Sequence, residues 1–233
     1  FPPKEIDSGT TGLVGLWHLN ENIGTTAADT TGGANTVANN GTLLGGTTWT
    51  TSSKLGASAL SFPTGASDYV SVPTEGSLNF GTGDFTLEGW LKTNEAAVAN
   101  TWLAIMDKTA QSGSIRTGHV IYLKGSDGNR LNVEINVSRD TSVACSSQPT
   151  VCAIVTSPNP VSDNAWHHFA AVKQASTLTL YIDGVAGVPV SHSVTGSLTN
   201  TGALNMGGDG VTSAVTYTGA IDEVAVYNRA LSA

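Results

Sequence analysis

Residues 85–92 read FTLEGWLK, and apolar and polar side chains alternate along this stretch. Period-two alternation places one set of side chains in a core and the other set outside, which is typical of a half-buried strand. The Asp-Gly pair at 183–184 follows another such run and predicts a tight hairpin turn. The other runs that predict strands lie at 13–19, 59–62, 69–72, 131–137, 166–172, 178–182 and 220–227.

The composition favours strands and turns over helices. Only 12% of residues are charged, and Gly, Thr, Ser, Val, Ala and Asn dominate. β-branched residues fit a pleated surface, and Gly, Asn and Asp fit turns. No segment repeats at a period of about 20–50 residues, and no break divides the chain in two. The sequence therefore predicts an all-β fold, a two-sheet antiparallel β-sandwich of the jelly-roll type, at residues 13–233, after a linker at residues 1–12.

The charge balance limits the classes of partner. Ten basic and 18 acidic side chains give a net charge of −8 at pH 7. An acidic surface repels phosphate backbones, so we expect no nucleic-acid partner. No apolar run is long enough to span a membrane, so we expect no membrane insertion, and the opening FPPKE is no signal peptide. We therefore expect that the sequence starts inside a longer precursor, whose export signal or anchor lies elsewhere.

Cys145 and Cys152 are the two cysteines, and six residues separate them. Metal-binding pairs normally have about two to four residues between the sulfurs and redox pairs have about two, so the spacing favours a disulfide that closes a short loop. Disulfides persist in oxidising compartments. The pair therefore predicts an extracellular or cell-surface protein.

An ordered set of short motifs resembles the laminin-G-like jelly-roll domain of the concanavalin A-like lectin/glucanase (laminin G/pentraxin) superfamily. The motifs are GLVGLWHLNE at 12–21, DTTGGAN at 29–35, NNGTL at 39–43, LSF at 60–62, DYV at 68–70, FTLEGW at 85–90, WHHF at 166–169, LYIDG at 180–184 and GAIDEVAVYNRAL at 219–231. The resemblance runs from about residue 12 to the end. It implies two stacked, curved antiparallel sheets.

The resemblance also implies a structural calcium ion where the first and last strands meet. Calcium binds six to eight oxygen ligands, and this sequence offers Asp222 and Asp29 first as side-chain ligands, then Glu21 and Asn35. Asp222 is a carboxylate inside an apolar strand and needs a partner if it faces inward, because an isolated buried carboxylate is costly. The alternative is that Asp222 accepts backbone N–H bonds and Asp29 caps a turn.

Tryptophans offer a second kind of site. Trp90 lies centrally in a predicted strand and shares one face with Glu88 and Lys92. A tryptophan beside polar groups on an open sheet face can stack on a sugar ring, and the alternative is that Trp90 fills the core. Trp49 and Trp102 lie in loop-like surroundings, where either could be a stacking platform.

No motif indicates catalysis. Glycosidases need a pair of facing carboxyl groups, whereas the adjacent Asp222 and Glu223 are expected on opposite faces of a strand. The five histidines are scattered and predict no zinc or catalytic cluster. We therefore expect a non-catalytic recognition module of a larger secreted or surface protein, with a glycan as partner and calcium as cofactor. The alternatives are a structural or adhesive domain that binds a cell-surface or extracellular protein or self-associates, and a glycoside hydrolase.

Overall fold

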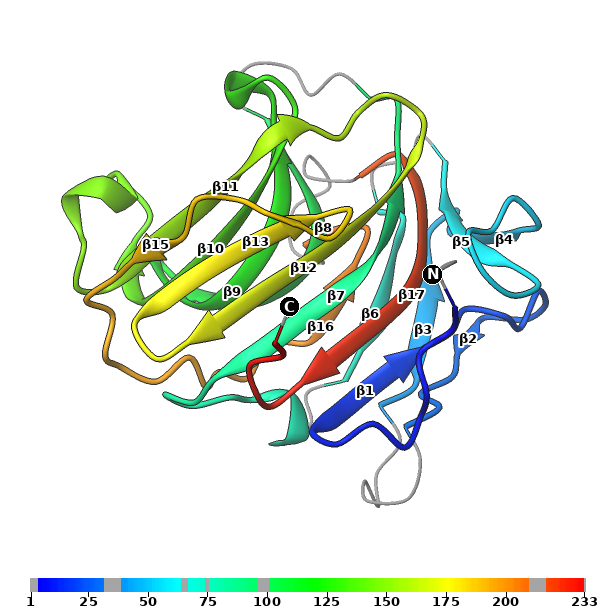
Figure 1. Cartoon of the computed structure of the whole chain (residues 1–233), viewed down its shortest axis with the longest axis horizontal. Coiled ribbons are helices and arrows are strands. Elements are labelled where there is room, and N and C mark those ends of the chain that lie inside the picture. Colours follow the sequence, from blue (N-terminus) through cyan, green and yellow to red (C-terminus); the bar gives the residue numbers. More distant parts are fainter. Residues whose placement is uncertain are drawn as a thin grey trace.

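The structure is a computed structural model, and it describes residues 4–31, 39–63, 67–73, 76–95, 101–209 and 217–232. Two antiparallel sheets stack face to face (Figure 1). In spatial order, sheet A consists of β14 (Val185–Ala186), β13 (Thr177–Ile182), β12 (Trp166–Gln174), β7 (Phe85–Lys92), β17 (Gly219–Tyr227), β5 (Ala59–Phe62) and β4 (Thr48–Thr50), with β1 (Leu13–Trp17) on β17 and β15 (Val190–Ser191) on β13.

Sheet B lies behind sheet A in Figure 1. Its strands are, in spatial order, β11 (Cys152–Pro160), β10 (Arg130–Asp140), β9 (Ile115–Lys124), β8 (Trp102–Ser112), β16 (Leu204–Met206), β6 (Tyr69–Val72), β3 (Gly41–Leu44) and β2 (Thr26–Ala27). The predicted two-sheet sandwich is therefore confirmed. Within the described ranges the helical segments are short 3-10 turns, at Gly76–Leu78, Gly125–Asp127 and Cys145–Ser147, and no helix there is long and apolar enough to cross a membrane.

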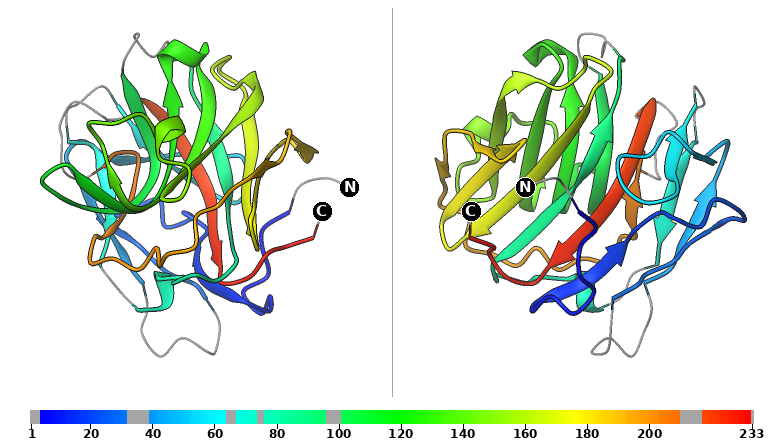
Figure 2. Two further views of the ribbon diagram at one scale, coloured as in Figure 1. Left: turned by 90° about the vertical axis from the view of Figure 1, so that its left-hand side faces the viewer. Right: turned by 45° about the vertical axis from the view of Figure 1, so that its right-hand side comes forward.

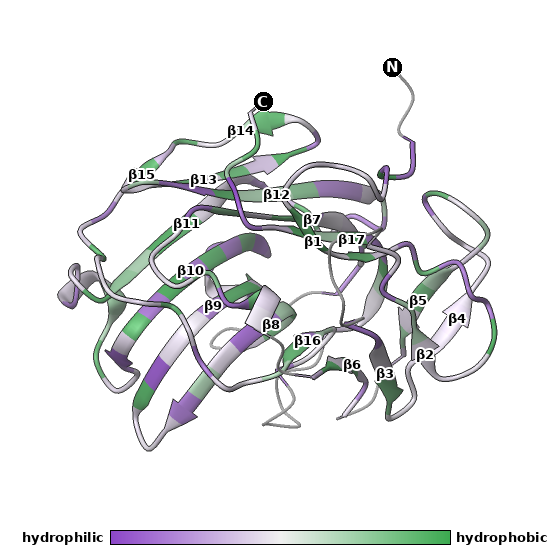
Figure 3. Ribbon diagram, turned by 90° about the horizontal axis from the view of Figure 1, so that it is seen from below, coloured by the Kyte–Doolittle hydropathy of each residue, from purple (hydrophilic) through white to green (hydrophobic). Residues whose placement is uncertain are grey.

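The core lies between the sheets, as the alternation along residues 85–92 predicts. Phe85, Leu87 and Leu91 on β7 are fully buried in it, and Leu131, Val133, Ile135 and others face them from sheet B. Figure 3 shows hydrophobic and hydrophilic residues alternating along the strands of sheet B. Each strand therefore has one apolar face toward the core and one face directed away from it.

The sequence predicts the strands of sheet A better than those of sheet B. All eight predicted runs form strands, and the turn at 183–184 has positive φ at both Asp183 (52°) and Gly184 (78°), as a two-residue hairpin turn requires. The prediction missed the long strands β8, β9 and β11 and the short strands β2, β3, β4, β14, β15 and β16. It was also wrong for Trp49 and Trp102, which lie in β4 and at the start of β8 instead of in loops.

Residues 4–12 contain no strand but contact the sandwich. Ile6 packs against a small apolar cluster on the outer side of β1 and β17. The Arg229 side chain donates a hydrogen bond to the carbonyl of Thr11, and Asn228 N–H donates to Gly12. The segments that lead to the two termini both lie on the sheet A side of the molecule (Figure 2).

Cys145 and Cys152 form the predicted disulfide, with their Cα atoms 5.4 Å apart. The bridge closes the loop that joins β10 to β11, at the edge of sheet B.

β17 contains a bulge that changes the direction of two acidic side chains. Its register against β7 shifts between Asp222, which lies opposite Trp90, and Ala225, which lies opposite Glu88. Glu223 has a φ of 49°, in the left-handed region. Ile221 and Val224, on either side of the acidic pair, both point into the core. The extra residue therefore directs Asp222 and Glu223 to the same outer face, and the expectation that they point to opposite faces was wrong, because a bulge interrupts the period of two.

Asp222 is fully buried and joins β17 to the loop before β5. Its Oδ2 accepts hydrogen bonds from the backbone N–H groups of Lys54 (2.8 Å) and Leu55 (3.0 Å), and its Oδ1 accepts one from Glu223 N–H (3.0 Å). Burial raises the pKa of Asp222 to about 7, although these N–H donors favour the charged form. Asp222 thus acts as an acceptor for backbone donors, which is one of the two roles expected for it.

Replacing both cysteines by alanine should lower the free energy of unfolding by about 2.5 kcal/mol, because the bridge restricts the unfolded chain over a loop of this length. Urea unfolding of the oxidised protein and of the Cys145→Ala/Cys152→Ala variant measures the difference. The control is the alanine variant measured with and without reductant. It has no disulfide to reduce, so its free energy of unfolding should be the same in both conditions. Equal stability of the two proteins would contradict the expected contribution.

The contribution of Asp222 to stability should fall as the pH rises from about 4 to about 7, because folded Asp222 keeps its proton in this range while the unfolded chain has lost it. An Asp222→Asn variant lacks this contribution, so the difference between its free energy of unfolding and that of the wild type, measured with urea at several pH values, should change over this range. Asp29→Asn is the control. Burial opposes ionisation of Asp29, but hydrogen bonds from Thr31, Asn39 and Leu16 outweigh it and lower its pKa, so this variant should keep the wild-type slope. Equal slopes for Asp222→Asn and the wild type would contradict the assignment.

Candidate functional site

The outward face of sheet A brings aromatic and acidic side chains together at its centre. Trp90 on β7 lies opposite His168 on β12 and opposite Asp222 on β17. Glu88, two residues before Trp90, lies on the same face opposite Ala170. Directly opposed residues on antiparallel strands share a face and lie close enough for their side chains to interact.

Two adjacent hollows lie on this face. The larger, of about 500 Å³, is lined by Lys4, Ile6, Lys54, Leu55, Glu88, Trp90, Trp166, His168, Asp183, Gly184 and Glu223. The smaller, of about 230 Å³, is lined by Thr86, Glu88, His168, Ala170, Val172, Tyr181, Gly184, Leu231 and Ser232. Because Glu88, His168 and Gly184 line both, the hollows form one continuous depression, which we call the sheet A groove.

Trp90 faces the larger hollow and does not fill the core. Its ring is half-buried, and the Lys54 ammonium lies over it, 4.4 Å from the ring centre. The His168 ring meets the Trp90 ring edge to face at 5.1 Å. Two positions were expected for Trp90, in the core or on an open sheet face, and the structure shows the second. Glu88 lies on the same face, as the sequence indicated.

The carboxylates of the groove are paired with histidines. His168 Nε2 lies 3.2 Å from Glu88 Oε2, and His18 Nδ1 lies 2.9 Å from Glu223 Oε1. Burial raises the pKa of Glu223, while the hydrogen bond and charge of His18 oppose the shift. The groove can therefore offer both hydrogen-bond donors and acceptors to a ligand.

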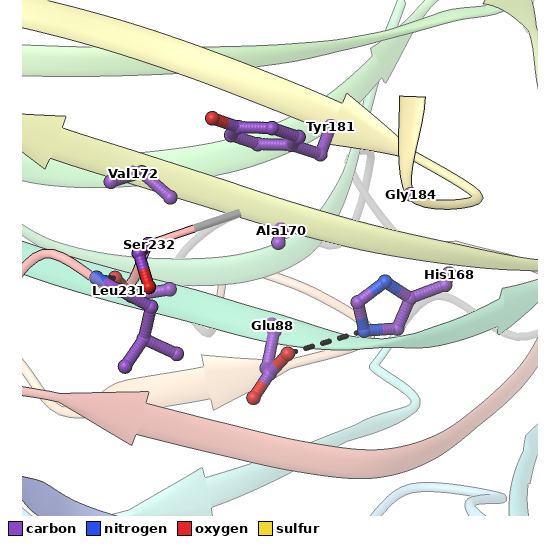
Figure 4. A pocket seen from close by; sticks show the side chains of 9 residues that line it. Glu88, His168, Ala170, Val172, Tyr181, Gly184, Leu231 and Ser232 are labelled. Carbon is purple, nitrogen blue, oxygen red and sulfur yellow. Dashed lines mark hydrogen bonds and ion pairs between the residues drawn. The ribbon is translucent and has the colours of Figure 1, made fainter. Parts of the chain in front are cut away.

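The smaller hollow is mostly apolar. Its floor consists of Ala170 and Val172 on β12, and Tyr181 on β13 forms one side (Figure 4). Leu231 closes the opposite side, and the Glu88–His168 pair lies at the end next to the larger hollow. Apolar walls with a few directed polar groups are typical of small-molecule sites.

The sequence singled out only part of this groove. Trp90 and Glu88 were found from the alternation along β7, whereas Trp166, His168 and Tyr181 were not connected with them. The strand register connects them with Trp90, because His168 lies opposite Trp90 and Tyr181 lies opposite Ala170 on the same face. The sequence alone does not show this register, because it does not show which strands are neighbours.

Asp29, one of the predicted calcium ligands, is saturated with hydrogen bonds. Its Oδ1 accepts bonds from Leu16 N–H (3.0 Å), Thr31 N–H (2.9 Å) and the Thr31 hydroxyl, and its Oδ2 accepts bonds from Asn39 N–H (3.0 Å) and Asn39 Nδ2 (2.9 Å). A carboxylate offers about four lone-pair positions. Asp29 therefore fixes the loop against β1, and no oxygen position is left for a cation.

The remaining predicted ligands are Glu21 and Asn35. Glu21 Oε1 accepts a bond from Ala28 N–H (2.7 Å), whereas its Oε2 is buried without a hydrogen-bond partner. Asn35 lies outside the described residues. Within the described part of the chain, no three His, Cys, Asp or Glu side chains form a group that could hold a metal ion. Asp222 and Asp29 bond to different donors, on the loop before β5 and on β1, and a shared calcium ion stays a prediction.

Comparisons with known proteins agree with the fold. A family model described as the concanavalin A-like lectin/glucanases superfamily matches residues 64–233. No curated protein sequence matches the chain.

Several solved structures share the architecture at low sequence identity. The binding domain of Paraclostridial mosquitocidal protein 1 is 17% identical, with a TM-score of 0.65 over 95% of this chain and 50% of that one. The binding domain of botulinum neurotoxin DC, in complex with SialylT, is 11% identical, with a TM-score of 0.67 over 95% and 49%. Domain 4 of AbnA, a GH43 extracellular arabinanase from Geobacillus stearothermophilus, in complex with arabinotriose, is 17% identical, with a TM-score of 0.59 over 94% of both chains.

This chain spans about half the length of the two toxin binding domains and nearly all of the arabinanase domain. Likeness at these identities shows a common fold only. The family model, in contrast, covers most of the sequence, including every strand from β6 to β17. Together with the stacked antiparallel sheets, this match shows that the chain belongs to the concanavalin A-like lectin/glucanases superfamily.

Proposed function

We propose that this chain is a non-catalytic glycan-recognition module that binds an oligosaccharide in the sheet A groove. The observation that carries the proposal is Trp90, a tryptophan on an open sheet face, at the floor of a hollow of about 500 Å³. Tryptophan offers a large rigid contact area for the apolar face of a sugar ring. Glu88, His168 and Asp183 around it offer acceptors and donors for sugar hydroxyls.

Lys54 must move for a sugar to stack on Trp90. A cation over an exposed aromatic ring contributes only about 0.5–1 kcal/mol, so its displacement costs little. The flexible stem of Lys54 then lets its ammonium donate hydrogen bonds to the hydroxyls of the sugar that replaces it. Lys54 thereby acts as a movable cover over Trp90.

The comparisons support the choice of ligand class. Two of the structures with this fold were solved with glycans, SialylT in one and arabinotriose in the other. Neither likeness identifies the sugar bound by this chain, so the choice of sugar rests on experiment.

The groove lacks a carboxyl pair that is free to act as acid and base. Glu88 is paired with His168, and Glu223 is paired with His18. Asp183 is paired with His167 and accepts a bond from His168 N–H, and Asp222 accepts bonds from three backbone N–H groups. Glycoside hydrolysis needs one carboxyl group that protonates the leaving oxygen and one that attacks or activates water. Binding without cleavage therefore fits this arrangement better.

The disulfide supports an extracellular or cell-surface location, since such bonds persist in oxidising compartments. We propose that the chain is part of a larger secreted or surface protein.

Replacing Trp90 by alanine should weaken glycan binding at least tenfold, because the sugar loses its stacking surface. A glycan array identifies oligosaccharides that bind the wild type, and calorimetry then compares wild-type and Trp90→Ala proteins. Trp49→Phe is the matched control on the same sheet, because Trp49 lies outside the groove and donates its Nε1–H to Gly24. It should bind like the wild type.

An empty array, or equal affinity of Trp90→Ala and wild type, would contradict the assignment of the groove. If an empty array coincides with concentration-dependent self-association in ultracentrifugation, the result favours the structural or adhesive function instead. Mass spectrometry of the bound oligosaccharide after incubation tests the non-catalytic role, because cleavage would contradict it.

Calcium binding is a separate proposal, supported by the buried, unpaired Oε2 of Glu21. An ion bound only by the folded state stabilises it by about 2.7 kcal/mol at a hundredfold excess over Kd. For a chain of this size that corresponds to a rise in Tm of about 5–10 °C. Calorimetric scans with calcium and with EDTA measure the shift, and Glu21→Gln should reduce it. Identical scans in calcium and EDTA would contradict calcium binding.

A further inference from the structure

A third hollow continues the sheet A groove beyond Trp166, and we call it the Lys92 hollow. It has a volume of about 290 Å³, and its polar lining includes Lys92, Thr50, Ser52, Ser61, Asn94 and Asn164. Strand register places it on the outer face of sheet A, because Ser61 lies opposite Ala220, Ala220 opposite Lys92, and Lys92 opposite Trp166. Since Trp166 lines the larger hollow of the groove, the two hollows are neighbours.

Lys92 and Trp90 lie on the same face of β7, two residues apart. Two residues of an antiparallel strand span about 7 Å, which is comparable to the length of one sugar unit. A ligand that stacks one unit on Trp90 can therefore place the next unit over Lys92.

Lys92 is the only charged side chain among the described residues that line this hollow. Glu95 lies nearby in the chain but outside the lining, and its Oε2 accepts a bond from Thr218 N–H (2.8 Å). The described lysines that pair with carboxylates are Lys124, with Asp127, and Lys173, with Asp84. The Lys92 ammonium therefore has no carboxylate partner in the part of the chain that the structure describes.

The acids of the adjoining groove, in contrast, already have partners. Glu88 pairs with His168, Glu223 with His18, and Asp183 with His167. Lys54 contacts the Trp90 ring, and none of the ion pairs between described residues includes it. An anionic group of a ligand beside Trp90 therefore meets two ammonium groups without having to displace a protein carboxylate.

The rest of the lining adds hydrogen-bond donors to the charge of Lys92. Ser52, Asn94 and Asn164 are exposed, and Lys92 is half-buried. Hydroxyl and amide groups can donate to the oxygens of an anionic group, which only accept, while the ammonium supplies the charge. Because hydrogen bonds to an ionised partner are about twice as strong as neutral ones, the Lys92 hollow favours an anionic group over a sugar hydroxyl.

We infer that the Lys92 hollow is a subsite for the anionic group, a carboxylate or a sulfate, of an acidic oligosaccharide. The inference rests on the proposed function, because it needs a neighbouring sugar unit on Trp90. The net charge of −8 opposes an acidic ligand only weakly. Distant charges are screened beyond about 8 Å at physiological salt, whereas an ammonium in direct contact with the ligand is not.

The first experiment compares acidic oligosaccharides with matched neutral ones at physiological ionic strength. A glycan array presents uronic-acid oligosaccharides beside their carboxyl-reduced forms, and sulfated oligosaccharides beside their desulfated forms. Calorimetry on the probes that bind gives the ratio of acidic to neutral affinity. We expect a ratio of at least ten for one pair in the wild type, and the pair that shows it distinguishes a carboxylate from a sulfate.

The second experiment measures the same ratio in variants of Lys92. Lys92→Gln keeps hydrogen-bonding capacity but loses the charge, so the ratio should fall at least fivefold. Lys92→Arg keeps the charge and should give a higher ratio than Lys92→Gln. Lys124→Gln is the matched control, because it removes the same charge on sheet B and should keep the wild-type ratio. Thermal unfolding verifies that each variant is folded.

The outcomes separate the subsite from the groove. Neutral probes that bind as tightly as their acidic counterparts, and lose binding on Trp90→Ala, would overturn the Lys92 subsite and leave the groove intact. A ratio that Lys92→Gln changes no more than Lys124→Gln does would also overturn the subsite. An array without bound probes, or binding that Trp90→Ala leaves unchanged, would contradict the groove itself and the subsite with it.

Discussion

The sandwich depends on the pairing of its last long strand, β17, with strands from both ends of the sequence. β17 lies against β7 along one edge and against β1 and β5 along the other, so it joins residues near the start of the chain to the centre of sheet A. Such long-range pairing fixes the register of the whole sheet. The bulge at Asp222 and Glu223 shifts that register by one residue. The buried Asp222 carboxylate stabilises the bulge by accepting hydrogen bonds from the backbone N–H groups of Lys54 and Leu55.

The same constraint determines which side chains lie outside the core. Because the core takes one face of every strand, polar and aromatic side chains collect on the two outer faces. Sheet A presents Trp90 and Glu88 in an open groove, and the bulge adds Glu223 to it. Sheet B presents charges that cancel in pairs, Arg116 with Asp107 and Arg139 with Glu134. The two faces thus differ in chemistry: one offers a stacking surface beside Lys54 and Lys92, the other ion pairs.

Much of the fold follows from the sequence, but the sites follow only in part. Alternation predicted β7, β12, β13 and β17, because their outward residues contrast with their inward ones. It failed for β8 and β9, where the polar residues Lys108 and His119 lie buried on the core-facing side and hide the pattern. The spacing of the cysteines predicted their disulfide. No local pattern could show that Asp222 and Glu223 share a face, or that Trp166 lies opposite Lys92, because both depend on neighbours distant in the sequence.

The central claim is that a glycan contacts the outer face of sheet A, and NMR of the tryptophan indole N–H groups tests it most directly. The five tryptophans report on separate places, and fully buried Trp17, whose Nε1 donates to Asn39 O, is an internal reference. On titration with an oligosaccharide that binds, the account predicts shifts at Trp90 and Trp166, with Trp17 unchanged. Saturation with that oligosaccharide without a shift at either Trp90 or Trp166 would contradict it.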